Sequence, residues 1–167
     1  HRLNRRQRQM CIRDRSYGYG LSVSAVQLAQ AYAVIANDGV KVPLTLKKVD
    51  GVPQGEQVIG KATARQLVQM LETVVSRVGT ARRAQVPGYQ VAGKTGTTND
   101  ARDVWFVGFT SNIVAGCYIG FDTPRSLGRG AGGGSFCAPV FNQFMQKATE
   151  KYGGGPFEVP PGGRFIK

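Results

Sequence analysis

One stretch near the middle of the chain carries residue types that could do chemistry in two incompatible ways. It reads GYQVAGKTGTT and runs from Gly88 to Thr98. The residues from Gly88 to Thr95 fit G-x-x-x-x-G-K-T, the loop with which nucleotide-hydrolysing enzymes hold phosphate groups. The residues from Lys94 to Gly96 fit K-T-G, an active-site strand motif of serine acyl-transfer enzymes that react with penicillin. The first pattern predicts a nucleotide and magnesium, whereas the second predicts a peptide substrate, an acyl-enzyme and no metal.

The sequence around the motif argues against the phosphate loop. Such a loop needs a buried strand before Gly88 and a helix that starts at Lys94, because the helix amino terminus holds the phosphates. Residues 80–88 are instead polar, and the residues after Lys94 favour a turn. The run 115–122 resembles an apolar strand that ends in a magnesium-binding aspartate, but it lies one hairpin away and not in a parallel sheet.

The K-T-G interpretation gives each residue of the motif a role. Lys94 offers a cation, and the hydroxyls of Thr95 and Thr97 offer hydrogen bonds, to a substrate carboxylate. Gly96 removes a side chain so that the substrate backbone can approach closely. The amide that follows Gly96 can form half of an oxyanion hole. We therefore expect Lys94, Thr95, Gly96 and Thr97 to be the site residues, with Lys94, Thr95 and Thr97 binding substrate.

These residues must be held on a strand, and the flanking sequence predicts a sheet. Strand-forming runs occupy residues 89–97, 104–110 and 113–121. The connectors between them are too short for the crossover that parallel strands need. We therefore expect three consecutive antiparallel strands, with Lys94 on the first.

Helical spacing of apolar residues predicts three helices. The first covers residues 22–38, with Ser24 as its cap and Gly39 at its end, and the second covers residues 62–78. The third covers residues 139–152, and its apolar stripe contains Val140, Phe141, Phe144, Met145 and Ala148. We expect residues 24–37 and 138–152 to pack against the sheet through their apolar positions.

The other segments are assigned from turn and strand signals. Residues 40–49 alternate enough to predict a strand, and Pro43 places it at a sheet edge. We expect a turn over residues 50–55 and a loop over residues 128–134. Residues 153–167 form a Gly/Pro-rich tail that need not pack.

Composition limits the class of protein. The 167 residues are 41% hydrophobic and 19% charged, which is typical of a globular domain. There is no run of about 18 apolar residues and no signal peptide. The net charge is +12, of which residues 1–15 contribute +5 through six arginines and one aspartate. This basic arm resembles a translated sequencing-adapter scar, so we expect it to be artefactual.

The cysteines and the single histidine predict no cofactor or metal site. Cys11 lies in the arm, and Cys117 and Cys137 do not make a disulfide framework. We expect these two thiols to act as small buried hydrophobes. His1 is the only histidine, so no metal-ligand cluster is indicated.

From Tyr17 onward the chain resembles the transpeptidase domain of high-molecular-weight penicillin-binding proteins, which cross-link bacterial peptidoglycan. The resemblance rests on the runs YGLSVSAVQLA, YAVIANDG, VAGKTGT, WFVGF and GFD. It implies an α+β fold, an antiparallel sheet flanked by helices of the penicillin-binding protein/β-lactamase type. It also implies that serine attacks a D-Ala-D-Ala bond and that Lys94, Thr95, Gly96 and Thr97 are this chain's share of the site.

The sequence departs from the family in three ways. Ser24-Ala25 replaces a usual Thr-Pro at a helix start. The part before Lys94 resembles class B members and the part after it resembles class A members, which suggests a chimera joined at a shared motif. No S-x-x-K or S-x-N motif occurs in these 167 residues. We therefore expect an incomplete fold over residues 16–152 that is inactive alone, because the nucleophile and its base are missing.

The resemblance further implies partners and a location. Stem peptides and β-lactams are the expected ligands, other cell-wall synthesis proteins are possible partners, and no nucleic acid is expected. The parent protein would work in the periplasm, held to the inner membrane by an anchor not contained here. The alternatives are a β-lactamase-like serine hydrolase fragment, a phosphate-loop protein, and a basic nucleic-acid-binding module that rests only on the charge.

Overall fold

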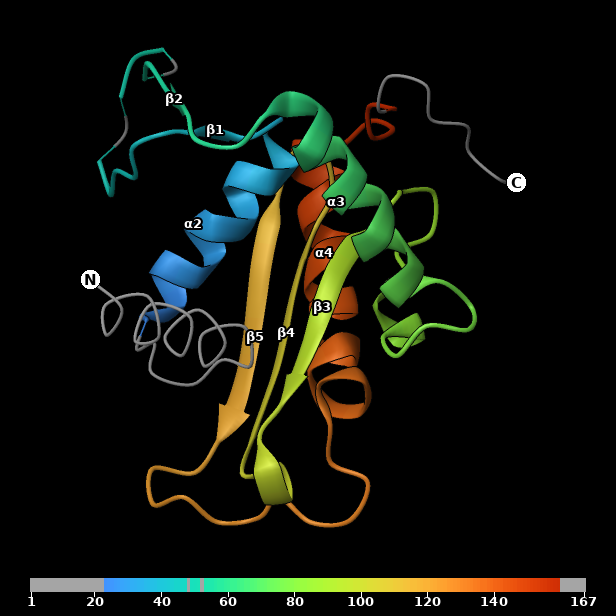
Figure 1. Ribbon diagram of the computed structural model, residues 1–167. Coiled ribbons are helices and arrows are strands. Elements are labelled where there is room, and N and C mark those ends of the chain that lie inside the picture. The colour runs from blue at the N-terminus through green and yellow to red at the C-terminus, as the bar shows by residue number, and fades with distance from the viewer. Residues whose placement is uncertain (1–22, 48, 52, 160–167) are drawn as a thin grey trace, which may run out of the picture.

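A three-stranded antiparallel sheet forms the centre of the fold (Figure 1). The computed structural model describes residues 23–47, 49–51 and 53–159. The strands are β3 (Ala92–Thr97), β4 (Asp103–Phe109) and β5 (Val114–Gly120), in the spatial order β3-β4-β5. The prediction of three consecutive antiparallel strands is confirmed. The first strand begins three residues later than expected, because Gly88 has a φ of 82° and the amide of Tyr89 turns back to the Val86 carbonyl.

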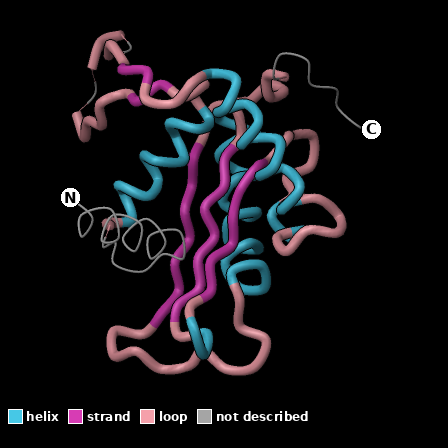
Figure 2. The backbone as a smooth tube through the Cα atoms, viewed as in Figure 1, coloured by secondary structure: helices cyan, strands magenta, loops and turns pink. Residues whose placement is uncertain are grey.

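Helices cover both faces of this sheet, as Figures 1 and 2 show. The helices α2 (Ala25–Ala36) and α3 (Lys61–Val75) lie on one face, and α4 (Ala138–Tyr152) lies on the other. We call these the α2/α3 face and the α4 face. The α+β class, with an antiparallel sheet flanked by helices, is confirmed.

Local sequence explains where the first helix starts. The Ser24 hydroxyl accepts a hydrogen bond from the Gln27 amide, and the Gln27 side chain accepts one from the Ser24 amide. This reciprocal capping box satisfies two amides that the first helical turn leaves without partners. The predicted Ser24 cap is confirmed, so the departure from Thr-Pro does not prevent helix initiation.

The α4 face has the larger apolar cluster. Phe106 of β4 packs edge-on against Phe141 of α4, with ring centroids 4.9 Å apart, and Met145 is fully buried beside them. Phe141 is 2% exposed, but Val140 and Phe144 are 51% and 56% exposed. The prediction that the whole stripe packs is therefore wrong for these two residues. Residues 141 and 145 are one helical turn apart and face the sheet, whereas 140 and 144 lie on the flank.

Two other sequence predictions need correction. Among the described residues of the predicted strand 40–49, only Val40–Lys41 form a strand, β1, which pairs with β2 (Glu56–Gln57). Pro43 has no amide to donate to a ladder, and the Thr45 side chain closes a turn with Lys47. The second helix ends at Val75 instead of residue 78, and Val78, the last residue of the predicted helix, is exposed.

The beginning of the C-terminal tail packs, contrary to expectation. Phe157 is 7% exposed and contacts Phe109 edge-on, with ring centroids 5.6 Å apart. Its amide donates to the Gln90 side chain at 2.6 Å. The prediction that the tail need not pack is therefore wrong at Phe157, while residues 1–15 and 160–167 lie outside the described part of the chain.

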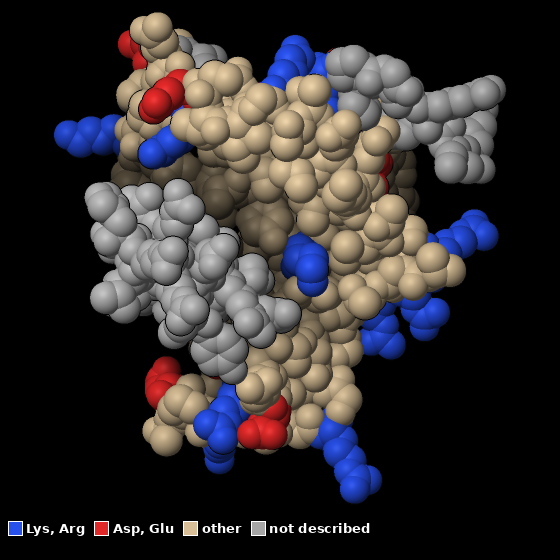
Figure 3. All heavy atoms as spheres, in the orientation of Figure 1, with Lys and Arg blue, Asp and Glu red and all other residues tan. Residues whose placement is uncertain are grey.

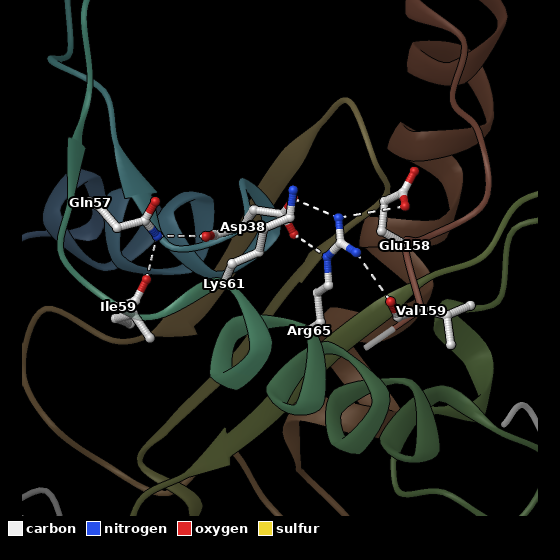
Figure 4. Close-up of polar contacts among 7 residues, drawn as sticks. All are labelled: Asp38, Gln57, Ile59, Lys61, Arg65, Glu158 and Val159. Carbon is white, nitrogen blue, oxygen red and sulfur yellow. Dashed lines mark hydrogen bonds and ion pairs between the residues drawn. The ribbon is translucent and has the colours of Figure 1, made fainter. Parts of the chain in front are cut away.

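An ion cluster joins the end of α2, the start of α3 and the tail (Figure 4). Arg65 Nε and Nη2 donate to the two Asp38 carboxylate oxygens at 2.7 and 2.9 Å, and Lys61 Nζ lies 3.1 Å from Asp38 Oδ2. Arg65 also donates to the Val159 carbonyl at 3.1 Å and lies 3.5 Å from Glu158 Oε2. The hydrogen bonds from Arg65 hold the pKa of Asp38 below its ordinary value.

Candidate active-site strand

The four predicted site residues lie together on β3, at an edge of the central sheet within the described residues. Lys94 is in the middle of the strand, opposite Val107 of β4. No helix begins at this lysine. The phosphate-loop alternative is therefore wrong, because it requires a helix amino terminus at this position.

The register divides these residues between the two faces of the sheet. Residues directly opposite in an antiparallel pair share a face. Gly96 is opposite Trp105, and Lys94 is opposite Val107, on the α2/α3 face. Thr95 is opposite Phe106, so Thr95 and Thr97 lie on the α4 face. The Lys94 ammonium group and the hydroxyls of Thr95 and Thr97 therefore lie on opposite faces of the sheet, along its β3 edge.

Lys94 is exposed, and its ammonium group donates to the Thr95 carbonyl at 2.8 Å. It forms none of the ion pairs found among the described residues. Figure 3 shows the α2/α3 face, where Lys and Arg side chains are spread mainly around the outline of the molecule. A lysine with its charge uncompensated on an exposed edge can accept an anionic group from solution.

The two threonine hydroxyls are oriented by contacts on the α4 face. Thr97 Oγ1 accepts a hydrogen bond from the Gly133 amide at 3.3 Å, and Thr95 Oγ1 lies 3.2 Å from Thr80 Oγ1. A hydroxyl has one proton and two lone pairs, so accepting from Gly133 leaves the Thr97 proton available for donation. Sequence reasoning missed Thr80 and Gly133, although the glycine run 132–134 was a visible signal.

The glycine run lets a helical turn press against the site strand. The turn η3 (Gly133–Cys137) is a π-helix that starts within the predicted loop 128–134. A Cβ at Gly133 would lie 2.0 Å from the Trp105 carbonyl oxygen and 3.0 Å from that of Gly96. One at Gly134 would lie 1.9 Å from the Thr80 carbonyl oxygen. Because glycine has no side chain at positions 133 and 134, the turn can approach β3 and β4 closely enough for the Gly133 amide to reach Thr97.

An aromatic pair occupies the α2/α3 face next to Gly96. The rings of Trp105 and Tyr118 have centroids 4.5 Å apart, and these residues lie opposite each other in the register. The Tyr118 hydroxyl donates to Asp103 Oδ1 at 2.7 Å, and this hydrogen bond raises the pKa of Tyr118. A Cβ at Gly96 would contact Trp105 Cβ at 3.3 Å. Gly96 thus keeps the strand surface open beside a large indole ring.

Two features are absent from the described residues. No group of three His, Cys, Asp or Glu side chains there could hold a metal ion. No helix in the same ranges is long and apolar enough to cross a membrane.

Comparison with known proteins identifies what the chain is similar to. Residues 6–146 match the penicillin-binding protein transpeptidase domain. Penicillin-binding protein 1A from Aquifex aeolicus is 41% identical over 151 residues, which cover 84% of this chain and 21% of that protein. The protein of the same name from Neisseria flavescens is 38% identical over 153 residues, which cover 82% of this chain and 19% of that protein.

A solved structure agrees with these matches. The apo transpeptidase domain of Burkholderia pseudomallei penicillin-binding protein 3 superposes with a TM-score of 0.67 at 37% identity. The match covers 81% of this chain and 44% of that domain. The chain thus spans about a fifth of the length of the two relatives named above and less than half of a solved transpeptidase domain.

The comparisons also bear on the remaining alternatives. The matched family binds penicillin, and the named relatives are penicillin-binding proteins. The β-lactamase and nucleic-acid-binding alternatives are therefore not supported. The artefactual arm and the join near Lys94 stay hypotheses. The family match begins at residue 6, and the match to the Aquifex aeolicus protein covers most of the chain.

Proposed function

Because this chain belongs to the penicillin-binding protein transpeptidase family, we propose that it supplies the carboxylate-binding strand of a serine D-Ala-D-Ala transpeptidase. The observation that carries this proposal is the position of Lys94–Thr97 on an edge strand, with the Thr97 hydroxyl oriented by the Gly133 amide. An edge strand has free backbone groups with which a peptide can pair.

Each site residue of β3 would make a different interaction with the peptide substrate. The Lys94 ammonium attracts the terminal carboxylate, and the Thr95 and Thr97 hydroxyls donate hydrogen bonds to it. The amide after Gly96 donates to the developing oxyanion in the tetrahedral intermediate. The missing side chain at Gly96 leaves room for the peptide backbone.

The complete reaction needs groups that this sequence does not contain. In the parent enzyme a serine, deprotonated by a lysine one helical turn away, attacks the D-Ala-D-Ala carbonyl and expels D-alanine. The amine of a neighbouring stem peptide then attacks the acyl-enzyme. Neither S-x-x-K nor S-x-N occurs among the 167 residues. The isolated chain is therefore expected to be inactive, because both the nucleophilic serine and the lysine that would deprotonate it are missing from these residues.

The parent protein would act on the cell wall. Its ligands would be stem peptides and β-lactams, and other cell-wall synthesis proteins would be its partners. It would work in the periplasm with an inner-membrane anchor. The support for this assignment is the family itself and the penicillin-binding protein 1A relatives.

The test uses a fluorescent penicillin followed by a denaturing gel and intact-mass measurement. The chain alone should show no covalent adduct. Addition of the upstream half of a related transpeptidase domain should produce an adduct on that half. Lys94→Ala should abolish this labelling, whereas Lys47→Ala, also at an exposed lysine, should leave it unchanged. A stoichiometric adduct on a serine of this chain alone, or labelling that survives Lys94→Ala, would contradict the proposal.

A further inference from the structure

Two cysteines from distant parts of the sequence lie over the same region of the α4 face. Cys117 of β5 is directly opposite Phe106 of β4, so their side chains share this face. Cys137 ends the π-helical turn η3, and its thiol donates to the Val104 carbonyl at 3.4 Å. Val104 and Phe106 are alternate residues of one strand and point to the same side. The two cysteines therefore lie over neighbouring positions of β4.

Their surroundings are apolar and shared. Cys137 is fully buried in the cluster formed with Phe106 and Phe141, and the half-buried Cys117 packs against that cluster. Burial raises the pKa of Cys137 to about 12, and the neighbouring Cys117 thiol contributes to the rise. Both residues are free thiols. No other cysteine lies within the described residues, and Cys11 precedes them.

We propose that Cys117 and Cys137 form an intramolecular disulfide when the chain meets a disulfide oxidant. The Cys117 thiolate attacks the oxidant's disulfide, forming a mixed disulfide and releasing one reduced thiol. The Cys137 thiolate then attacks the Cys117 sulfur, closes the bond and releases the second thiol. Two cysteine thiols are oxidised, one disulfide of the oxidant is reduced, and the two protons pass to its thiols.

The order of these steps follows from exposure. Cys117 is half-buried and can reach an oxidant in solution, whereas Cys137 is shielded by the cluster. Because only the thiolate attacks, the raised pKa of Cys137 makes ring closure slow in the folded chain at neutral pH and faster as the pH rises. The closed bond would fix η3 to β5. It would thereby restrain Gly133, the residue whose amide orients Thr97.

The test uses the full chain carrying Cys11→Ser, so that only the two thiols of interest remain. It is incubated with oxidised glutathione, denatured, treated with N-ethylmaleimide and weighed intact. We expect a product that has lost two hydrogen atoms and carries neither maleimide nor glutathione. Peptide mapping should join Cys117 to Cys137, and formation should accelerate with pH. Two maleimide adducts, or a stable glutathione adduct, at the end of the reaction would overturn the proposal.

A displaced cysteine provides the matched control. In Cys117→Ser combined with Ala115→Cys, the thiol stays on the same face of β5 but moves away from Cys137 by two residues, about 7 Å along the strand. Added to the separation that the two residues already have, this shift carries their α-carbons beyond the range that a disulfide tolerates. Closure in this variant should be at least about tenfold slower in buffer but similar in concentrated guanidinium, where the fold no longer selects a pair. Equal closure rates in buffer would overturn the proposal.

A second measurement needs no substitution at the two cysteines. The Cys11→Ser chain is compared in its oxidised and reduced forms by thermal unfolding. The oxidised form should unfold at a higher temperature, because the bond restricts the unfolded chain between residues 117 and 137. An unchanged or lower midpoint would show that closure distorts the packing around Phe106 and would contradict the proposed geometry.

Discussion

Gly133 and Thr97 are joined by a hydrogen bond of 3.3 Å although 36 residues separate them in the sequence. The amide of the π-helical turn η3 occupies one lone pair of the threonine hydroxyl and leaves its proton free. The same glycine lies so close to the Trp105 carbonyl that no side chain fits. The glycine run therefore forms a turn and also positions the Thr97 side chain of β3.

Gly133→Ala should destabilise the fold. The added methyl group would lie 2.0 Å from the Trp105 carbonyl oxygen, so η3 or β4 must move. Overpacking of this kind costs about 1–3 kcal/mol. Urea unfolding followed by circular dichroism measures the change. Gly155→Ala is the control, because a Cβ there meets nothing within 4 Å, and it should change the free energy of unfolding by less than about 0.5 kcal/mol. Equal effects of the two substitutions would contradict the close contact.

The tail residue Phe157 should contribute strongly to stability. Phe157→Ala removes a buried ring that contacts Phe109 edge-on, and such truncations cost about 3–5 kcal/mol in well-packed cores. Phe144→Ala removes the same atoms from a side chain that is 56% exposed, and should cost less than about 1 kcal/mol. Chemical unfolding of the two variants in parallel compares them directly. A smaller loss for Phe157→Ala than for Phe144→Ala would mean that the tail does not pack in solution.

Asp38 should make stability depend on acid pH. Arg65 lowers the folded-state pKa of this carboxyl below its ordinary value of 3.8. Its contribution is therefore complete above the unfolded-state pKa and is lost as the pH falls through the lowered, folded-state pKa. Asp38→Asn should lower the free energy of unfolding at pH 7, and this difference should shrink on acidification. Unfolding curves over a pH series test this, with the exposed Asp50→Asn as control. A difference that stays constant with pH would exclude the ion cluster as its source.

Glu72 should have the opposite effect. Burial raises the pKa of its carboxyl above the ordinary value of 4.5, so the charged form is disfavoured in the fold. The cost is absent below the unfolded-state pKa and grows as the pH rises through the folded-state pKa. Glu72→Gln should therefore raise the thermal midpoint at pH 7 and leave it nearly unchanged at low pH. Glu150→Gln, at an exposed position of α4, is the control. A lower midpoint at pH 7 would show that the carboxylate has a stabilising partner.

The parts of the fold that the sequence predicted are those that local chemistry determines. The strand at Lys94 follows from short connectors that allow only antiparallel neighbours, and the Ser24 cap follows from hydrogen bonds within one helical turn. Pairing of Thr97 with Gly133 and burial of Phe157 could not be predicted in this way. They join residues far apart in sequence, and periodicity within one segment does not report such contacts. Phe144 was predicted to face the core because it fits the apolar spacing of its helix, but it is exposed. Apolar spacing therefore does not by itself show that a residue is buried.

The short connectors of the β3-β4-β5 meander have a consequence for the order in which the molecule folds. Contacts between neighbouring strands close only small loops, which costs little conformational entropy. The two hairpins β3-β4 and β4-β5 can therefore form early in folding. The bond from Arg65 to Val159, which spans 94 residues, closes a much larger loop. The strand that carries Lys94 can thus form before the contacts between Arg65 and the C-terminal tail form. Amide exchange should accordingly protect β4 before it protects the segment around Phe157 during refolding.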